Sequence, residues 1–381
     1  MPNYVHDATE LLCKLIAIPS VSRNEQSAAD LMARYLQQWG LPYGREGNNL
    51  WVGCQDWDDR KPTVMLNAHI DTVKPVPTYT RDPFRPTIEG DTLYGLGSND
   101  CGGGLVTLLQ VYRIMKDRPR AYNILYLASA EEDVSGADGL SRVLPHMPPI
   151  SVAIVGEPTS MQPAIAEKGL MVIDGYAHGV SGHAARYSPP DIPNTQHPAR
   201  PKDACYQRDA RTPNTQNSVN AIYEALDDLV WLRDYRFRKS SPLLGPTKMT
   251  VTVVEAGTQH NVVPDLLHFV IDVRPNEYYQ NEYLFQFLRR HMKKCELKAR
   301  SFRLRPSSIS ADHPLVRRCV QLGMQPFGSP TLSDQALMPW PSLKLGPGNS
   351  CRSHTADEFI RISELDHAIS TYIQLLDGLQ L

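Results

Sequence analysis

Two histidines and several carboxylates follow short apolar segments at widely separated points of the chain. They are His69, Asp71, Glu131, Glu132, Glu157 and His354. The apolar segments are residues 63–67, 122–129, 151–155 and 342–345. Imidazole and carboxylate groups are ligands that Zn²⁺, Co²⁺ and Mn²⁺ accept in proteins. If the fold gathers these side chains, they would bind divalent metal ions and could support metal-assisted hydrolysis.

The four apolar segments predict the strands of one sheet. Short apolar strands that alternate with helices favour an α/β domain with a largely parallel sheet. In open α/β sheets, ligands bind at the carboxyl ends of the strands. A glycine-rich turn at 95–99 places Asp100 just before a predicted helix at 102–115. We therefore expect one site at this edge. Polar residues with unrelated structural roles would not all lie at the ends of strands.

The spacing of these residues indicates which of them would bind metal, which would orient a ligand and which would act as general base. A bridging carboxylate, with one imidazole and one carboxylate for each ion, is a reasonable two-metal arrangement. Asp71 follows His69 by two residues and could accept the second imidazole N–H. Glu131 and Glu132 are adjacent, so we expect one to bind metal and the other to act as general base.

Composition limits the other classes of function. Lys plus Arg total 39 and Asp plus Glu total 41, so charge gives no indication of binding to nucleic acid or an anionic membrane. No apolar run is long enough to span a bilayer, and the acidic N-terminus does not read as a signal peptide. The seven widely spaced cysteines predict free thiols in a reducing compartment, and hence a cytoplasmic protein.

A chain of 381 residues suits two domains. We predict a discontinuous catalytic domain over 1–167 and 305–381, with helices on both faces of its sheet. A smaller α+β domain is predicted over 168–304. Its predicted strands are 170–178, 248–255 and 268–273, and its predicted helices are 221–238 and 282–294. The proline-rich stretch 187–217 reads as a long surface insertion, with a functional flap as the alternative.

Eight stretches of the chain resemble the M20 family of zinc peptidases and aminoacylases, in family order. They are NAHIDTV (67–73), DTLYGLGSND (91–100), ASAEED (128–133), VGEPTS (155–160), VSGHAAR (180–186), NVVPD (261–265), IDVRP (271–275) and GPGNSCRSHTADEF (346–359). The branch that looks most similar contains acetylornithine deacetylases and succinyl-diaminopimelate desuccinylases. The resemblance covers nearly the whole chain except the 187–217 insert.

The resemblance implies two divalent metal ions, Zn²⁺ or Co²⁺. One would be held by His69, Asp100 and Glu157. The other would be held by Asp100, Glu132 and His354, so that Asp100 bridges the pair.

The resemblance also implies roles outside the ligand set. Asp71 would orient His69, and Glu131 would be the general base. His183, in the family's lid domain, would stabilise the oxyanion in the active site of the partner subunit of a homodimer. Asn261 and Arg274 match lid positions that help to hold substrate.

One residue departs from the family pattern. Cys101 stands where Met or Ala is usual. A thiol beside a bridging ligand could coordinate metal, although a buried small side chain is the simpler reading.

Within this branch, the chain looks most like an enzyme that deacetylates N-acetyl-L-ornithine in arginine biosynthesis. N-succinyl-ornithine and N-succinyl-diaminopimelate are rival substrates, because a succinyl carboxylate asks for a cation. Lys168, Arg186, Arg274 and Arg352 are available, and Arg352 is the first candidate. A dipeptidase on the same scaffold and a non-catalytic binding protein are further alternatives, and lost ligands would mark the latter.

Overall fold

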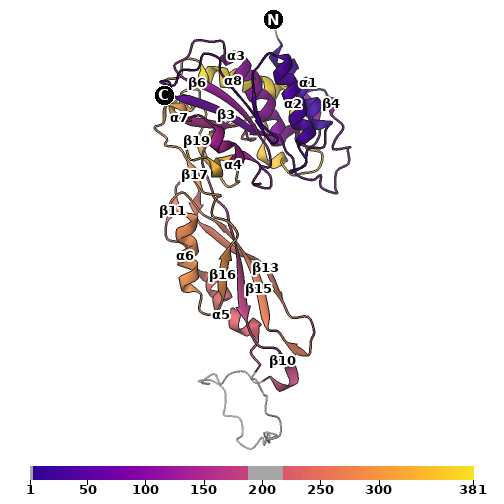
Figure 1. Ribbon diagram of the computed structural model, residues 1–381, viewed down its shortest axis with the longest axis vertical. Coiled ribbons are helices and arrows are strands. Elements are labelled where there is room, and N and C mark those ends of the chain that lie inside the picture. Colours follow the sequence, from indigo (N-terminus) through magenta and orange to yellow (C-terminus); the bar gives the residue numbers. More distant parts are fainter. Residues whose placement is uncertain (1–2, 188–217) are drawn as a thin grey trace, which may run out of the picture. The chain divides into compact units, whose positions relative to one another are not determined.

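The computed structural model describes residues 3–187 and 218–381, which form two compact units (Figure 1). The first unit comprises Met1–Gly169, Ser241–Gly245 and Arg303–Leu381. The second comprises Leu170–Ser240 and Pro246–Phe302. Apart from Tyr187, the predicted insert at 187–217 lies outside the described residues.

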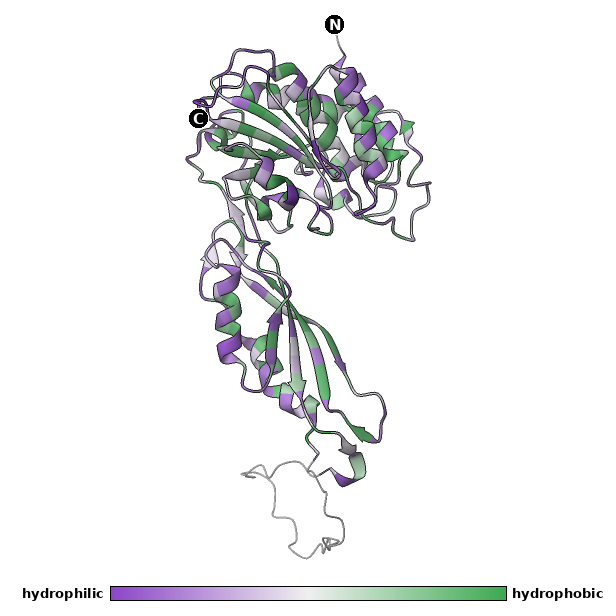
Figure 2. Cartoon of the chain, in the orientation of Figure 1, coloured by the Kyte–Doolittle hydropathy of each residue, from purple (hydrophilic) through white to green (hydrophobic). Residues whose placement is uncertain are grey.

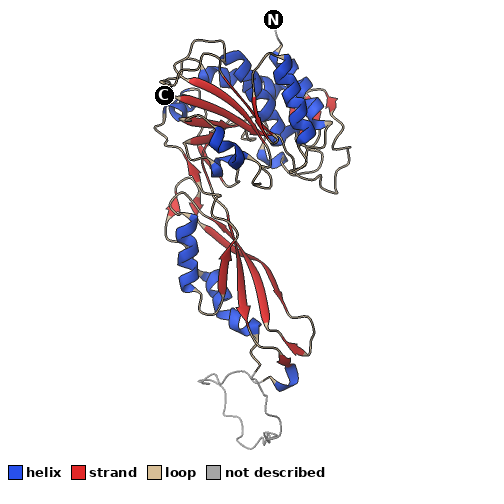
Figure 3. Ribbon diagram, in the orientation of Figure 1, coloured by secondary structure: helices blue, strands red, loops and turns tan. Residues whose placement is uncertain are grey.

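The first unit is built on one large sheet whose central strands are parallel (Figure 3). Their order is β6 (Asn123–Ser129), β3 (Thr63–His69), β7 (Val152–Val155) and β19 (Ser342–Lys344). Antiparallel strands flank them, namely β1 (Gly44–Glu46), β2 (Asn49–Gly53), β8 (Ala164–Glu167) and β17 (Ser307–Ser308), while β18 (Phe327–Ser329) runs parallel to β8. The predicted α/β fold with a mostly parallel sheet is confirmed.

Helices cover both faces of this sheet. The main helices of the unit are α1 (Tyr4–Ile16), α2 (Gln26–Gln38), α3 (Gly103–Met115), α4 (Leu140–Val143), α7 (Pro314–Gln321) and α8 (Ile362–Leu376). Successive side chains of a strand point to opposite faces. Accordingly Val64 and Leu66 pack in the core that includes α1, α3 and α8, whereas Met65 packs with α4. Strands β3 and β6 are buried along their whole length, which accounts for their mainly apolar sequences (Figure 2).

Smaller elements complete the first unit. Strands β4 (Thr87–Glu89), β5 (Thr92–Tyr94) and β20 (Phe359–Arg361) form a three-stranded sheet. Short helical turns are η1 (Ser98–Gly102), η2 (Leu144–His146), η4 (Asp334–Leu337) and η5 (Ser350–Arg352). Within the described residues, the structure contains no helix long and apolar enough to cross a lipid bilayer.

The second unit is an antiparallel sheet with two helices. The strand order is β13 (Lys248–Ala256), β15 (Leu266–Arg274), β9 (Met171–His178) and β16 (Glu296–Ala299). The helices are α5 (Ala221–Asp234) and α6 (Asn281–His291). The minor elements are β10 (Gly182–His183), η3 (Ala184–Arg186) and β14 (Val262–Val263). The short strands β11 (Ser240–Ser241) and β12 (Gly245–Pro246) each include one residue from either unit. Alternate residues of β9 are buried, as expected for a sheet with one covered face.

Both helices of the second unit are shorter than predicted. α5 ends at Asp234 because Tyr235 adopts an extended backbone with ψ of 138°. α6 likewise ends at His291, before Met292 with ψ of 130°. Tertiary packing therefore overrides the helical pattern that continues in the sequence after each of these points.

Candidate metal centre

The carboxyl end of β3 brings His69 against three carboxylates. His69 Nε2 lies 3.3 Å from an oxygen of Asp100, 3.7 Å from Glu157 Oε1 and 3.8 Å from Glu132 Oε2. Asp100 is in η1, Glu157 follows β7, and Glu132 follows β6. Because β6, β3 and β7 are adjacent and parallel, their carboxyl ends lie at one edge of the sheet. Residues from distant parts of the chain therefore form one cluster there.

Asp100 lies between the two histidines, with one carboxylate oxygen facing each of them. Its Oδ1 is 3.3 Å from His69 Nε2 and its Oδ2 is 3.4 Å from His354 Nε2. His354 Nε2 also lies 3.3 Å from Asp133 Oδ1. Asp133 was not among the predicted site residues, and it occupies the place beside His354 that was expected for Glu132.

Asp71 holds together the turns that carry the ligands. Its two carboxylate oxygens accept the backbone N–H groups of Glu132 and Asp133 at 3.0 and 3.2 Å. The Ser22 hydroxyl donates to Asp71 Oδ2 at 2.7 Å. His69 Nδ1 is 2.9 Å from the Asp71 carbonyl oxygen and 3.5 Å from Asp71 Oδ1. Asp71 is thus next to His69 as predicted, but the shorter contact is to its main chain.

The Glu131 carboxylate lies outside the cluster in this structure, and its role as general base stays a prediction. Glu131 has a left-handed backbone with φ of 53°, which turns the chain directly after β6. Its Oε2 accepts the Asp138 N–H at 3.3 Å. A Cβ added to Gly136 would lie 1.6 Å from this same oxygen, so the carboxylate packs against the Gly136 backbone. Glu132 and Asp133 line the site pocket instead.

The donor groups of the cluster fit a divalent cation. A carbonyl oxygen only accepts hydrogen bonds, so His69 Nδ1 carries a proton, and Nε2 is the ring nitrogen that faces the carboxylates. Glu157 Oε1 is buried, and within the described residues it has no hydrogen-bond partner. Acceptors that face acceptors in a buried site repel one another unless a cation lies between them.

Burial and mutual repulsion raise the pKa values of two carboxylates in the cluster. Burial and the Asp100 charge raise the pKa of Glu157 to about 8. Burial also raises the pKa of Glu132 well above its usual value. The hydrogen bond to Asp133 raises the pKa of His354. These shifts are typical of a site in which close carboxylates require positive charge.

Cys101 lies at the base of the cluster. A ring nitrogen of His69, the Cys101 sulfur and a Glu157 oxygen all lie within 4.8 Å of one another. The thiol also approaches the Gly156 carbonyl at 3.7 Å, and burial raises the pKa of the thiol to about 12. The protonated form is therefore favoured, and Cys101 acts as a packed small side chain in this arrangement.

A buried carboxylate, Glu358, positions the loop that carries Asp100. Its Oε2 accepts the Gly97 N–H at 3.0 Å. Its Oε1 accepts the N–H groups of Asn99 and Asp100 at 2.9 and 2.8 Å. The sequence motif contains Glu358, but nothing in the sequence pairs it with residues 97–100. Three backbone donors are satisfied by this one side chain, which fixes the backbone that carries Asp100.

We expect Glu358→Gln to loosen the Asp100 loop. The glutamine amide nitrogen would face a backbone N–H, and one unsatisfied buried donor lowers the free energy of unfolding by about 1–3 kcal/mol. Metal content after gel filtration, measured by inductively coupled plasma mass spectrometry, should also fall. The matched control is Asp357→Asn, whose carboxylate accepts the N–H groups of Thr80 and Arg81 at the surface. If both variants retain metal like the wild type, Glu358 does not position Asp100.

A cavity of about 510 Å³ opens onto the cluster. Besides the acidic residues, its lining is rich in hydroxyl groups, including those of Thr159, Ser329 and Thr331. Its floor includes Lys344, whose ammonium group is buried and lies 2.9 Å from Glu167 Oε2. Burial opposes the charge of Lys344, but Glu167 and the cluster carboxylates raise its pKa. Sequence reasoning missed Lys344 because it follows the apolar pattern of a buried strand.

Two of the predicted substrate-binding cations do not reach this cavity. Arg352 forms a two-pronged salt bridge with Glu364, at 2.7 and 3.0 Å, and its guanidinium lies 4.5 Å from the Phe359 ring centroid. Lys168 is buried. Neither belongs to the cavity lining that the described residues form. Arg352 is thus paired with Glu364, and the substrate-binding roles of Arg352 and Lys168 stay predictions.

The other predicted residues lie in the second unit. His183 is exposed at the β10–β14 pair, and its Nδ1 accepts the Ala185 N–H at 3.1 Å. The Asn261 carbonyl accepts the Ala184 N–H at 3.0 Å, so Asn261 is close to His183 along this pair. Arg274, at the end of β15, pairs with both oxygens of Asp272 at 2.8 and 3.0 Å. Their roles toward substrate remain predictions.

A parallel sheet with two imidazoles and four carboxylates gathered at its carboxyl edge defines a metal-dependent hydrolase. The sequence model of Peptidase family M20/M25/M40 matches residues 65–378, and the chain belongs to this family. The resemblance noted in the sequence is thereby confirmed.

Two relatives and a solved structure match the chain over nearly its full length. A succinyl-diaminopimelate desuccinylase of Stenotrophomonas maltophilia is 24% identical over 97% of this chain and 98% of its own length. An acetylornithine deacetylase of Buchnera aphidicola is 24% identical over 92% of each chain. The fold is similar to that of Bacillus subtilis YXEP, a dinuclear metal-binding M20 peptidase, with a TM-score of 0.68, 15% identity and coverage of 99% of both chains.

Proposed function

We propose that this chain is a two-metal deacylase that removes the N-acyl group of an acylated amino acid, most simply N-acetyl-L-ornithine in arginine biosynthesis. The observation that carries the proposal is the position of Asp100, with one oxygen toward His69 and the other toward His354. A carboxylate shared between two imidazoles in this way suits a bridging ligand of two ions. The free thiols of the described cysteines support a cytoplasmic location.

The proposed ligand sets differ in one residue from those expected from the sequence. His69, Asp100 and Glu157 would hold one ion, and Asp100, Asp133 and His354 would hold the other. Bound there, the two ions would supply Lewis acidity for the amide carbonyl and lower the pKa of the attacking water.

Glu132 then remains as the proposed general base. Its carboxylate lines the cavity 3.8 Å from His69 Nε2, while its backbone N–H is fixed by Asp71. Glu132 would take the proton from the attacking water and return it to the leaving amine, which is otherwise a poor leaving group. His183 keeps its proposed role as the donor that stabilises the oxyanion.

The charges in the cavity lining favour an acetyl group over a succinyl group. Among the lining residues that the structure describes there is no arginine, and the charge of Lys344 is met by Glu167. An acetyl group needs no cation, whereas a succinyl carboxylate does. We therefore propose the acetylated substrate first, because its acyl group needs no cation in the cavity.

Lys344 also favours a second candidate, N-succinyl-L-ornithine. Its ammonium group lines the cavity together with the hydroxyls of Ser329 and Thr331, and such a floor could accept a second carboxylate. In that case the double variant Lys344→Met/Glu167→Met should raise KM for the succinyl substrate at least about tenfold, the loss of roughly one charged hydrogen bond. Removing both charges avoids leaving one buried ion unpaired. KM for the acetyl substrate should be unchanged.

The first test compares amine release from N-acetyl-L-ornithine and N-succinyl-L-ornithine by the Zn²⁺- or Co²⁺-loaded enzyme. Release that a chelator abolishes and added metal restores supports the deacylase, and the ratio of kcat/KM values identifies the acyl group. If neither substrate is cleaved while dipeptides with a free α-amine are, the chain is a dipeptidase. If two metals bind and nothing is hydrolysed, the catalytic proposal is wrong.

We also propose a homodimer formed through the second unit. Tyr223, Leu226 and Val230 lie at helical spacing on α5 and are 55, 48 and 45% exposed. Strand β13 is the edge of the adjoining sheet and exposes Val253 and Val254. An apolar helix stripe beside an unpaired strand edge is typical of a surface that a second copy covers.

We expect Leu226→Glu/Val230→Glu to convert the dimer to a monomer, because two charges would be buried without partners. Light scattering coupled to gel filtration measures the mass directly. Ile88→Glu replaces an apolar side chain that is 51% exposed on the separate strand β4, and it should leave the mass unchanged. A monomeric wild type would rule out this interface.

A further inference from the structure

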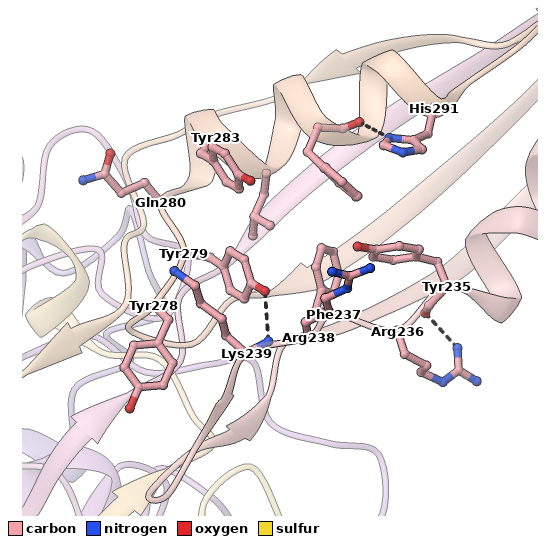
Figure 4. Close-up of a pocket in the computed structure, with 12 residues that line it drawn as sticks. Tyr235, Arg236, Phe237, Arg238, Lys239, Tyr278, Tyr279, Gln280, Tyr283 and His291 are labelled. Atoms are coloured by element: carbon pink, nitrogen blue, oxygen red, sulfur yellow. Dashed lines mark hydrogen bonds between the residues drawn. The ribbon is translucent and has the colours of Figure 1, made fainter.

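A second cavity, distinct from the metal centre, lies within the second unit. It has a volume of about 730 Å³, which is within the usual range for small-molecule sites. Segment 235–239 forms one wall, and residues 278–291, which include α6, form the other (Figure 4). Neither the proposed hydrolysis nor the proposed dimer uses this groove.

The α6 wall is a stripe of aromatic rings. Tyr283, Phe287 and His291 follow one another at intervals of four residues and share a face of α6, and Tyr279 lies just before the helix begins. The rings of Tyr279 and Tyr283 are nearly parallel, at 19°, with centroids 6.3 Å apart. Phe237 lies 5.5 Å from Tyr279 on the opposite wall. Tyr283 is 59% exposed, so its ring is accessible from solvent.

The facing wall is cationic. Arg236, Arg238 and Lys239 line the groove, and its described lining contains no aspartate or glutamate. Lys239 Nζ lies 5.6 Å from the Tyr279 ring centroid, while Arg236 donates to the carbonyls of Arg233 and Tyr235. Within residues 3–187 and 218–381, Arg238 and Lys239 have no carboxylate partner. The groove therefore offers ring faces and uncompensated positive charge side by side.

We propose that this groove binds a nucleoside phosphate, with its base stacked on Tyr283 and its phosphate beside Arg238 and Lys239. Bases stack on exposed aromatic side chains without needing sequence-specific contacts. The phosphate is attracted by arginine and lysine, whose charges are here not neutralised by acids. An anion alone would leave the rings uncovered, and a cationic ring would be repelled. The chemistry of both walls is matched by a ligand that carries a ring and an anion.

Calorimetric titration of the intact protein with AMP tests the proposal, with adenosine and inorganic phosphate as the two fragments. We expect saturable binding of AMP with a Kd below about 1 mM, and binding at least about tenfold weaker for either fragment. Raising the salt concentration should weaken AMP binding, because exposed charges are screened.

Two variants separate the contribution of the cations to AMP binding from that of the stacked ring. Arg238→Gln/Lys239→Gln and Tyr283→Ala should each weaken AMP binding at least about tenfold, the usual size of a lost charge pair or base stack. Arg290→Gln removes an exposed cation of α6 that lies outside the groove lining and should leave Kd unchanged. Circular dichroism of each variant checks that it is folded.

Four results would overturn the proposal. The first three are the absence of saturable AMP binding, binding that both groove variants retain in full, and phosphate binding as tight as AMP binding. The fourth is binding of an acidic peptide in place of AMP, because the groove would then be a protein-docking surface. Each readout is independent of amide hydrolysis.

Discussion

Replacing Glu132 with glutamine is expected to reduce kcat by about a thousandfold, within the range for loss of a general base. The substitution keeps the size of the side chain and leaves all five proposed ligands in place. Metal content should therefore stay near two ions per chain, measured by inductively coupled plasma mass spectrometry. A loss of turnover without a loss of metal is the signature of a residue that moves protons.

Glu131→Gln is the matched control, because it makes the same chemical change one residue earlier. The Glu131 carboxylate packs against Gly136 and accepts the Asp138 N–H, away from the cavity lining. We expect at most a severalfold change in kcat for this variant. If Glu131→Gln is inactive while Glu132→Gln retains turnover, the assignment of the base must be reversed.

Asp100→Asn should have the second large effect, on metal binding as well as on turnover. The amide removes the negative charge that faces both histidines, and amides are weaker ligands than carboxylates for Zn²⁺. We expect the dissociation constant of at least one ion to rise more than about tenfold, a change of roughly 1.4 kcal/mol. Competition with a metallochromic chelator measures both affinities, and kcat/KM should fall with the occupancy of the weaker site.

Cys101→Ala tests whether the thiol next to Asp100 also contributes to metal binding. If Cys101 is a packed thiol, its removal should lower stability slightly and leave both metal affinities unchanged. With Co²⁺ bound, the wild type should lack the intense near-ultraviolet absorption of a cobalt–thiolate bond. An affinity loss for Cys101→Ala equal to that of Asp100→Asn would place the sulfur in the coordination sphere and contradict this assignment.

Tertiary contacts determine which side chains near the site face the cavity, and the local sequence does not. Three acidic residues follow β6, and their order alone does not say which side chains face the cavity. The left-handed turn at Glu131, held by the bonds from Glu132 and Asp133 to Asp71, directs the last two inward. Arg352 lies near His354 in sequence, but its pairing with Glu364 removes it from the site.

The sequence by itself determined the α/β class, the largely parallel character of the main sheet and the family. These features follow from local patterns, namely apolar runs that bury a strand on both faces and polar residues placed where each strand ends. Only the tertiary structure decided the order of the strands, the direction of Glu131, the pairing of Arg352, the contact of Glu358 with the Asp100 loop, and the place of Lys344 in the cavity lining. Such contacts join distant segments, and their side-chain directions depend on backbone turns and burial that a one-dimensional pattern does not encode.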